Sequence, residues 1–167
     1  PRHPLEVLTT LERVAHDPSL AGVVVHISDL HLGWGRSLEL RRVLLRIRDS
    51  GKKVVVHFDD IDDLGYIVAS AADKVFVTPS GSIGLDGVRA QLIYLGDTLE
   101  KFGIRAEAIA AGEYKTAPHF LTHNGPSDEE LEVQNALLDA FYETLVAAVA
   151  QSRQLDAAEV KRIIALG

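Results

Sequence analysis

The stretch GVVVHISDLHLGWGRSLELRRVLLRIRDSGKKVVVHF, residues 22–58, decides the fold. It opens and closes with two β-branched runs, residues 22–27 and 53–58, whose composition is typical of buried strands. Between the runs, apolar residues recur with the period of one helix face, at Leu40, Val43, Leu44 and Ile47. We expect Ser37 to cap this helix and Gly51 to end it in the left-handed conformation. Strand, helix and strand in close succession predict a right-handed crossover between parallel strands, and therefore an α/β fold.

Outward from this unit, helical and strand patterns continue to alternate. The acidic residues 59–63 could suggest a cation site, but they lack the ligand order of a calcium loop. We therefore expect them to form a solvated loop. Ser127 and Glu130 form the pattern of a capping box, which predicts the start of a long helix. The other expected elements are helices at 5–16 and 64–72, a strand at 75–77, a turn at 79–81, a helix marked by Leu92 to Phe102 and closed by Gly103, a strand at 104–110 and a last helix from Asp156.

Size and composition limit the classes of function. The 167 residues suit one domain, so we expect a single domain over residues 1–167. The net charge is -7 and no run of basic residues forms a stripe, so nucleic acid is not an expected partner. The chain contains no cysteine, which excludes disulfides and thiolate metal ligands. It begins at Pro1 without an initiator methionine, and we interpret it as a part excised from a longer protein.

One motif suggests metal chemistry and has to be weighed. The segment Ile27-Ser28-Asp29-Leu30-His31-Leu32-Gly33 resembles the first motif of the metallophosphoesterases, in which Asp and His hold a metal. A two-metal site needs several further ligands. Gly96-Asp97 lies within a helical pattern rather than at a strand end, and the histidines at positions 3, 16, 26, 31, 57, 119 and 123 show no ligand spacing. The sequence therefore predicts no metal site and no cofactor.

Three blocks of sequence carry a more specific resemblance. They are Arg48 to Lys52, Gly65 to Lys74, and Gly112-Glu113-Tyr114-Lys115-Thr116-Ala117-Pro118. In this order they resemble the signal peptide peptidase A (protease IV) family over roughly residues 8 to 165. The resemblance implies a fold of the Clp protease and crotonase type, a spiral of strand-strand-helix units with flanking helices. It also implies a serine-lysine dyad, in which an uncharged lysine amine takes the proton of the serine hydroxyl.

The resemblance assigns one catalytic residue to this chain. Lys115 matches the lysine of the family's Gly-x-Tyr-Lys-x-Ala pattern, so it is the candidate general base, and a lysine base must be shielded from water to be uncharged. The family's nucleophile opens a Ser-Gly-Gly-Tyr segment, whereas this chain has Asp63-Leu64-Gly65-Tyr66. Double-length members place the lysine in the first half and the serine in the second. We therefore interpret this chain as the amino-terminal, lysine-supplying half, with Ser82 as a possible further partner of the lysine.

The resemblance also implies partners and a location. The carboxy-terminal half of the same polypeptide would supply the serine, and the enzyme would assemble as a homotetramer. The parent protein would be associated with the cytoplasmic membrane, with its catalytic region outside the cytoplasm, and would degrade cleaved apolar signal peptides as a serine endopeptidase. Alternatives are a non-catalytic scaffold half for oligomer assembly, a metallophosphoesterase, and acyl-CoA chemistry on the crotonase-type architecture.

Overall fold

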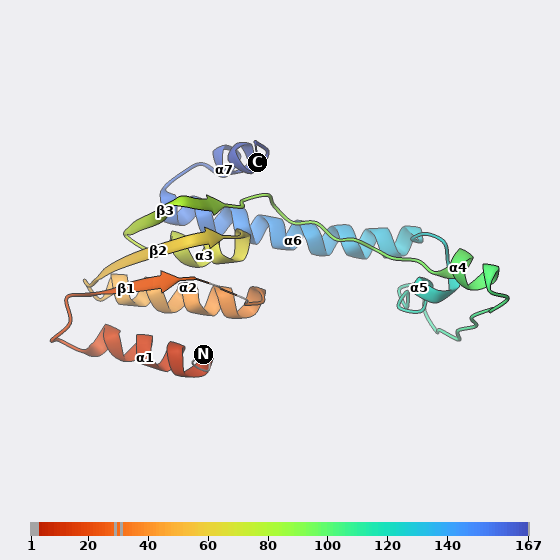
Figure 1. Cartoon of the computed structure of the whole chain (residues 1–167), viewed down its shortest axis with the longest axis horizontal. Helices are drawn as coiled ribbons and strands as arrows, with labels where there is room; N and C mark the ends of the chain where they lie inside the picture. The colour runs from red at the N-terminus through yellow and green to blue at the C-terminus, as the bar shows by residue number, and fades with distance from the viewer. Residues whose placement is uncertain (1–3, 29, 31, 167) are drawn as a thin grey trace. The chain divides into compact units, whose positions relative to one another are not determined.

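The computed structural model describes residues 4–28, 30 and 32–166, and the chain divides into two compact units (Figure 1). The first unit combines residues 1–87 with residues 144–167, and the second consists of residues 88–143. The first unit holds a small parallel sheet and the helices that cover it. The chain is thus a mixed α/β protein, in agreement with the predicted class.

The sheet is built from three parallel strands in the order β1-β2-β3. These are β1 (Gly22–Ile27), β2 (Lys53–Ile61) and β3 (Lys74–Ile83). Residues of β1 and β2 pair in register, so that Val25 lies opposite Val56 and His26 lies opposite His57. The helix α2 (Trp34–Asp49) connects β1 to β2. The predicted parallel pair joined by a helix is confirmed.

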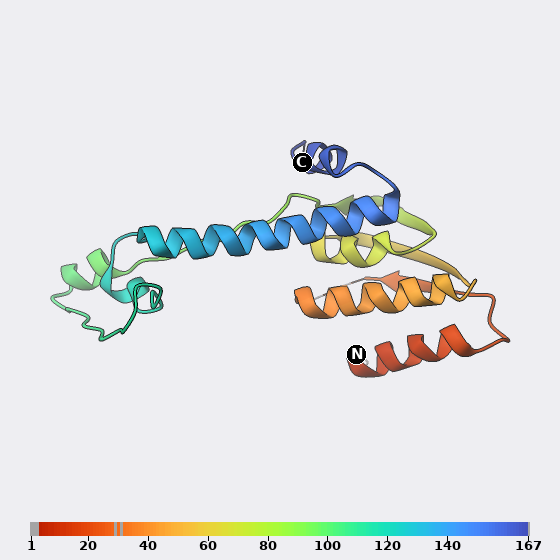
Figure 2. The same ribbon diagram turned by 180° about the vertical axis from the view of Figure 1, so that it is seen from behind.

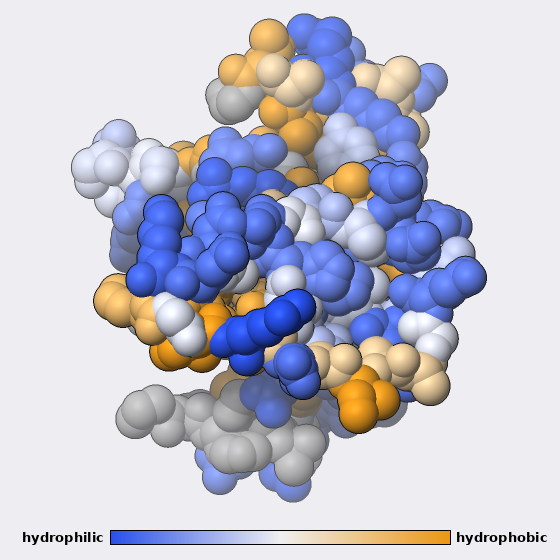
Figure 3. Space-filling view, turned by 90° about the vertical axis from the view of Figure 1, so that its right-hand side faces the viewer, coloured by the Kyte–Doolittle hydropathy of each residue, from blue (hydrophilic) through white to orange (hydrophobic). Residues whose placement is uncertain are grey.

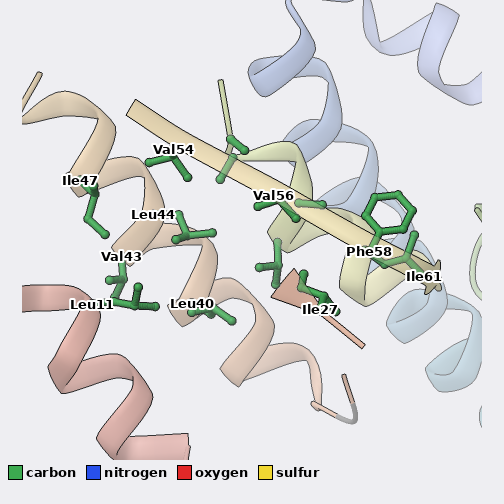
Figure 4. Close-up of a cluster of buried hydrophobic side chains, with 14 residues drawn as sticks. Leu11, Ile27, Leu40, Val43, Leu44, Ile47, Val54, Val56, Phe58 and Ile61 are labelled. Carbon is green, nitrogen blue, oxygen red and sulfur yellow. The ribbon is translucent and has the colours of Figure 1, made fainter. Parts of the chain in front are cut away.

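One face of this sheet forms the hydrophobic core. Val54, Val56 and Phe58 alternate along β2 and are fully buried. They pack against α2 and α3 (Asp63–Ser70), and α1 (Pro4–His16) packs in turn against α2. These three helices lie on one side of the sheet (Figures 2 and 4). On the opposite face, Val24 of β1 and Phe76 of β3 are 73% and 52% exposed. The sheet therefore has one covered and one open face.

Three details of the first unit correct the sequence predictions. Ser37 does not cap α2, because the helix begins one turn earlier after Gly33 and the Ser37 side chain is buried. Asp59 and Asp60 belong to β2, which continues to Ile61, so the predicted acidic loop at 59–63 is wrong for these residues. The predicted turn at 79–81 is likewise strand, because β3 continues to Ile83. The pairing shifts register between Phe58 and Asp60, so β3 carries a bulge at this point.

The bulge explains why local propensity failed there. The carboxylate of Asp60 accepts hydrogen bonds from the backbone N–H and the hydroxyl of Ser82, at 2.9 and 2.7 Å. Gly81 lies so close to β2 that a Cβ atom at this position would be 1.9 Å from the carbonyl oxygen of Asp59. Tertiary pairing thus extends both strands through residues that favour turns.

The C-terminal helices complete the first unit. The last turns of α6 (Asp128–Arg153) and the helix α7 (Ala157–Ile164) contribute buried residues, among them Leu145, Val149 and Val160. The buried Arg41 of α2 donates a hydrogen bond of 2.8 Å to the carbonyl oxygen of Ala148, which ties α6 to α2. The predicted cap of α6 is confirmed, since Ser127 Oγ accepts from the Glu130 N–H at 3.2 Å.

The second unit has less regular structure than predicted. Its described part contains α4 (Gly96–Lys101), α5 (His119–Thr122) and the first turns of α6. Gly103 ends α4 with a positive φ of 70°, as predicted, but α4 begins later than Leu92, and residues 104–110 form no strand. A strand needs a neighbour to satisfy its backbone, and these residues have none in the described structure.

Surface hydrophobicity is unevenly distributed. The face of the molecule in Figure 3 is mainly hydrophilic, with separate hydrophobic patches. Among the hydrophobic residues of the second unit, Phe102, Ile104 and Ile109 are largely exposed. None of the described helices combines the length and the apolar character required for crossing a bilayer.

Candidate functional site

Lys115 lies in the loop between α4 and α5 of the second unit. Its backbone N–H donates to the carbonyl oxygen of Gly112 at 3.1 Å, closing a tight turn. Gly112 has a φ of 106°, in the left-handed region where glycine is strongly favoured. The Lys115 side chain is exposed, and its amine has no hydrogen-bond or ion-pair partner among the residues described. In this chain the amine is therefore solvated.

The neighbours of Lys115 fix the backbone rather than enclose the amine. The Tyr114 hydroxyl donates to Glu132 Oε2 at 3.1 Å, and this carboxylate raises the pKa of the Tyr114 phenol by hydrogen bonding and by its charge. On the other side, the carbonyl oxygen of Thr116 accepts from the His119 N–H at 2.9 Å, just before α5. Tyr114 and Ala117 are exposed, so these neighbours do not form a pocket for the amine in this chain.

Asp63, which the sequence resemblance places at the position predicted for the family's serine, is the first residue of α3. Asp62 precedes it as the N-cap and accepts from the Gly65 N–H at 2.7 Å. The Asp63 carboxylate accepts from the Gly87 N–H at 3.2 Å. Burial raises the pKa of the Asp63 carboxyl, and the negative charges of Asp86 and Asp62 add to this effect. The chain thus holds a partly desolvated carboxyl group at this helix start.

A shallow hollow of about 550 Å³ surrounds Asp63 at one edge of the sheet. The carboxyl ends of all three strands reach it, and parallel α/β sheets commonly place their sites at this edge. Its lining is rich in carboxylates and small polar groups: Ser28, Leu30, Asp60, Ile61, Asp62, Asp63, Ser82, Gly84 and Asp86. Among the described residues, no lysine and no histidine contributes to this lining. The described lining thus places carboxylates beside the hydroxyls of Ser28 and Ser82, without the lysine that a serine-lysine dyad requires.

Two serines of the first unit, Ser82 and Ser70, donate their hydroxyls to local hydrogen bonds. Ser82, the possible partner of the lysine, donates its hydroxyl to Asp60 and belongs to the unit that does not contain Lys115. Ser70 is buried in α3 and donates back to the carbonyl oxygen of Ile67 at 2.8 Å, as its helical position predicts. Neither hydroxyl contacts a lysine or a histidine among the described residues.

The metallophosphoesterase-like motif can be judged only in part. Asp29 and His31 lie outside the described residues. Asp97, the residue of the half-matching second motif, lies in the first turn of α4 rather than at the end of a strand. Within the described part of the chain, Asp97 therefore does not occupy the strand-end position that the second metal-binding motif requires.

A group that the sequence reasoning missed lies on the open face of the sheet. The rings of His26 and His57 stack with their centroids 5.0 Å apart, and Asp59 lies beside them. Spacing along the chain does not reveal this group, because its members are 31 and 2 residues apart. The sequence feature that could have revealed the group is the Val-Val-Val-His sequence, which occurs in both predicted parallel strands and places the two histidines at equivalent positions.

Comparison with known proteins identifies a family. The model of "Peptidase family S49" matches residues 46–165. The chain is 32% identical over 155 residues to "Serine protease SPPA, chloroplastic" of Arabidopsis thaliana, which covers 93% of this chain and 23% of that protein. It is 23% identical over 154 residues to "Protease 4" of Haemophilus influenzae, covering 90% of this chain and 25% of that protein. A "Protease 4" of Salmonella typhi is 21% identical over 151 residues, covering 90% and 24%. The chain thus spans about a quarter of the length of these relatives.

Proposed function

The chain belongs to peptidase family S49, and from this membership we propose that it supplies Lys115 as the general base of a serine-lysine dyad whose serine lies outside this chain. The expected family is confirmed by the match over residues 46–165 and by relatives that are named proteases. The division of the dyad between two halves follows the sequence resemblance to double-length members of the family and belongs to the proposal.

The observation that carries this proposal is the carboxylate at position 63. Asp63 begins α3 at the carboxyl edge of the sheet, and the sequence resemblance assigns the family's serine to this position. A carboxylate has no hydroxyl proton that a lysine could remove, so it cannot attack an amide as serine does. In the proposed reaction, an external serine gives its proton to the Lys115 amine and attacks the scissile carbonyl. The lysine then protonates the leaving amine, and water hydrolyses the acyl-enzyme.

The exposure of Lys115 defines what the partners have to do. A lysine in water is protonated at neutral pH, so a base lysine has to be covered by another surface. We propose that the carboxy-terminal half of the same polypeptide covers it within a homotetramer. Exposed apolar side chains of the second unit, including Phe102, Ile104 and Ile109, support such a contact, because large exposed apolar groups mark interaction surfaces.

The remaining features of the proposal come from the family resemblance. They are apolar signal peptides as substrates, a parent protein associated with the cytoplasmic membrane whose catalytic region lies outside the cytoplasm, and the Clp/crotonase-like spiral in the assembled enzyme. The parallel sheet and its alternating helices are compatible with that spiral.

The test is substitution of Lys115 in the full-length parent. Lys115→Ala should lower the turnover of an apolar peptide ester by about 10²–10⁴-fold or more, because the base is lost. Lys115→Arg should fail equally, because guanidinium stays protonated. Lys101→Ala is the matched control at another exposed position, and Asp63→Ala should retain most activity. Size-exclusion chromatography of each variant shows whether assembly is intact.

A second candidate is a non-catalytic scaffold half, favoured by the solvated, unpartnered Lys115 amine among the described residues. The same variants separate the two functions. A fully active Lys115→Ala enzyme of normal assembly would leave the scaffold as the function of this chain.

A further inference from the structure

Three side chains with metal-binding atoms meet on the open face of the sheet. His26 of β1 and His57 of β2 are direct register partners, and Asp59 follows two residues later on β2. The His26 Nε2 atom lies 3.8 Å from Asp59 Oδ2. One ligand atom from each of the three side chains lies within 4.8 Å of the other two.

The backbone fixes this arrangement. Neighbouring strands are about 4.8 Å apart, and successive residues point to opposite faces, so register partners in parallel strands project side by side. Because Val56 and Phe58 point into the core, His57 and Asp59 point to the open face. The side chains of His26 and Asp59 are 54% and 48% exposed, so an ion could reach them from solvent.

The separations suit one small ion after minor side-chain rotation. Zinc bonds of about 2.0–2.2 Å in tetrahedral geometry place ligand atoms roughly 3.4 Å apart. The observed 3.8 Å between His26 and Asp59 is close to this value. Two imidazoles and one carboxylate are borderline ligands that suit zinc and its neighbours rather than magnesium or calcium. Three protein ligands leave one position for water.

A second layer of contacts already orients the carboxylate. The Thr78 hydroxyl of β3 donates to Asp59 Oδ1 at 2.5 Å and lies 3.4 Å from His57 Nε2. This bond occupies one carboxylate oxygen and leaves Oδ2, the atom nearest His26, for an ion. Such outer contacts are typical of metal sites, where they fix ligand orientation.

We infer that His26, His57 and Asp59 form a binding site for one divalent transition-metal ion, with zinc as the first candidate and Thr78 as a positioning residue. The ion would link β1 to β2 on the face that the core helices leave open. This inference is independent of the peptidase proposal, because it concerns binding by the chain itself.

The test is titration of the metal-free chain with Zn²⁺, followed by calorimetry and by elemental analysis after gel filtration. We expect one ion per chain, lost in His26→Asn and in His57→Asn but retained in His123→Asn, a matched histidine of the second unit. Thr78→Val should weaken binding by about 10–100-fold. Co²⁺ should give the visible absorption of a tetrahedral site in the wild type and not in Asp59→Asn.

Several outcomes would overturn the inference. Uptake below one ion per chain, or equal uptake by wild type and His26→Asn, would show that these side chains do not bind the ion. Equal losses in His26→Asn and His123→Asn would indicate unspecific binding to surface histidines. Circular dichroism of each variant distinguishes a lost ligand from a lost fold, and the exposed His26 is the position where substitution leaves the core untouched.

Discussion

The contact between Gly81 and β2 allows a quantitative test of the extended strands. In Gly81→Ala the new Cβ atom would lie 1.9 Å from the carbonyl oxygen of Asp59, whereas an ordinary contact begins at 3.4 Å. The clash is with backbone, so no side-chain rotation relieves it, and β2 and β3 would have to separate by about 1.5 Å. This movement would disrupt the bonds between Asp60 and Ser82 and the continuation of the strand pair.

The expected loss follows from these terms. Forced overpacking costs about 1–3 kcal/mol, and hydrogen bonds to a charged group contribute about 1.5–3 kcal/mol when buried and less when exposed. We expect a decrease of about 3 kcal/mol in the free energy of unfolding, which corresponds to roughly 6–12 °C in Tm for a chain of this size. Thermal unfolding followed by circular dichroism measures this shift.

Gly84→Ala is the matched control for this experiment. Its Cβ atom would lie 3.6 Å from the carbonyl oxygen of Ile61, an ordinary contact, so its Tm should stay within about 2 °C of wild type. A Gly81→Ala protein that melts together with wild type would refute the close approach of β3 to Asp59. It would also remove the basis for extending β3 through residues 79–81.

Three further predictions concern the first unit. Asp63→Asn should raise the Tm at neutral pH, because burial raises the pKa of the Asp63 carboxyl in the folded state, while the amide oxygen can still accept from the Gly87 N–H. This advantage of the variant should shrink as the pH falls through the raised pKa and disappear below the ordinary aspartate pKa of 3.8, and an advantage that grows in acid would contradict the assignment. Asp62→Ala should lower stability by about 1 kcal/mol because the cap to the Gly65 N–H is lost, whereas Asp62→Asn should be nearly neutral in chemical denaturation. Leu44→Ala should cost about 2–5 kcal/mol, measured in the same way, since the side chain is fully buried, and a loss below 1 kcal/mol would contradict the core as described.

The comparison of sequence and structure shows where local patterns are sufficient. The segment 22–58 was predictable because β2 and α2 each bury one consistent set of residues, such as Val54, Val56 and Leu44. Asp59 and Asp60 were predicted as loop because acidic residues are unfavourable in strands. Their carboxylates are satisfied by Thr78 and Ser82 of β3, and these contacts depend on a pairing that one strand does not reveal.

The opposite error occurred in the second unit. Residues 104–110 contain the β-branched Ile104 and Ile109, yet they form no strand, because propensity without a neighbouring strand leaves the backbone groups unpaired. For the candidate site, sequence similarity alone selected Lys115, since nothing in its composition distinguishes it from a surface lysine. Its solvation is a property of three-dimensional surroundings and could not be predicted from the pattern around it.

One irregularity in the sheet connects the two regions of chemical interest in the first unit. The bulge in β3 brings Thr78 to Asp59 on the open face and Ser82 to Asp60 at the hollow beside Asp63. Gly81 lies between these two contacts and permits both, because only a residue without a side chain fits against the Asp59 carbonyl oxygen. Separation of β2 from β3 would therefore release the Asp59 carboxylate as well as the Asp60 carboxylate. Gly81→Ala should accordingly weaken zinc binding at His26 and His57 even at temperatures where the chain remains folded, and unchanged zinc affinity in the folded variant would show that Asp59 is oriented independently of the bulge.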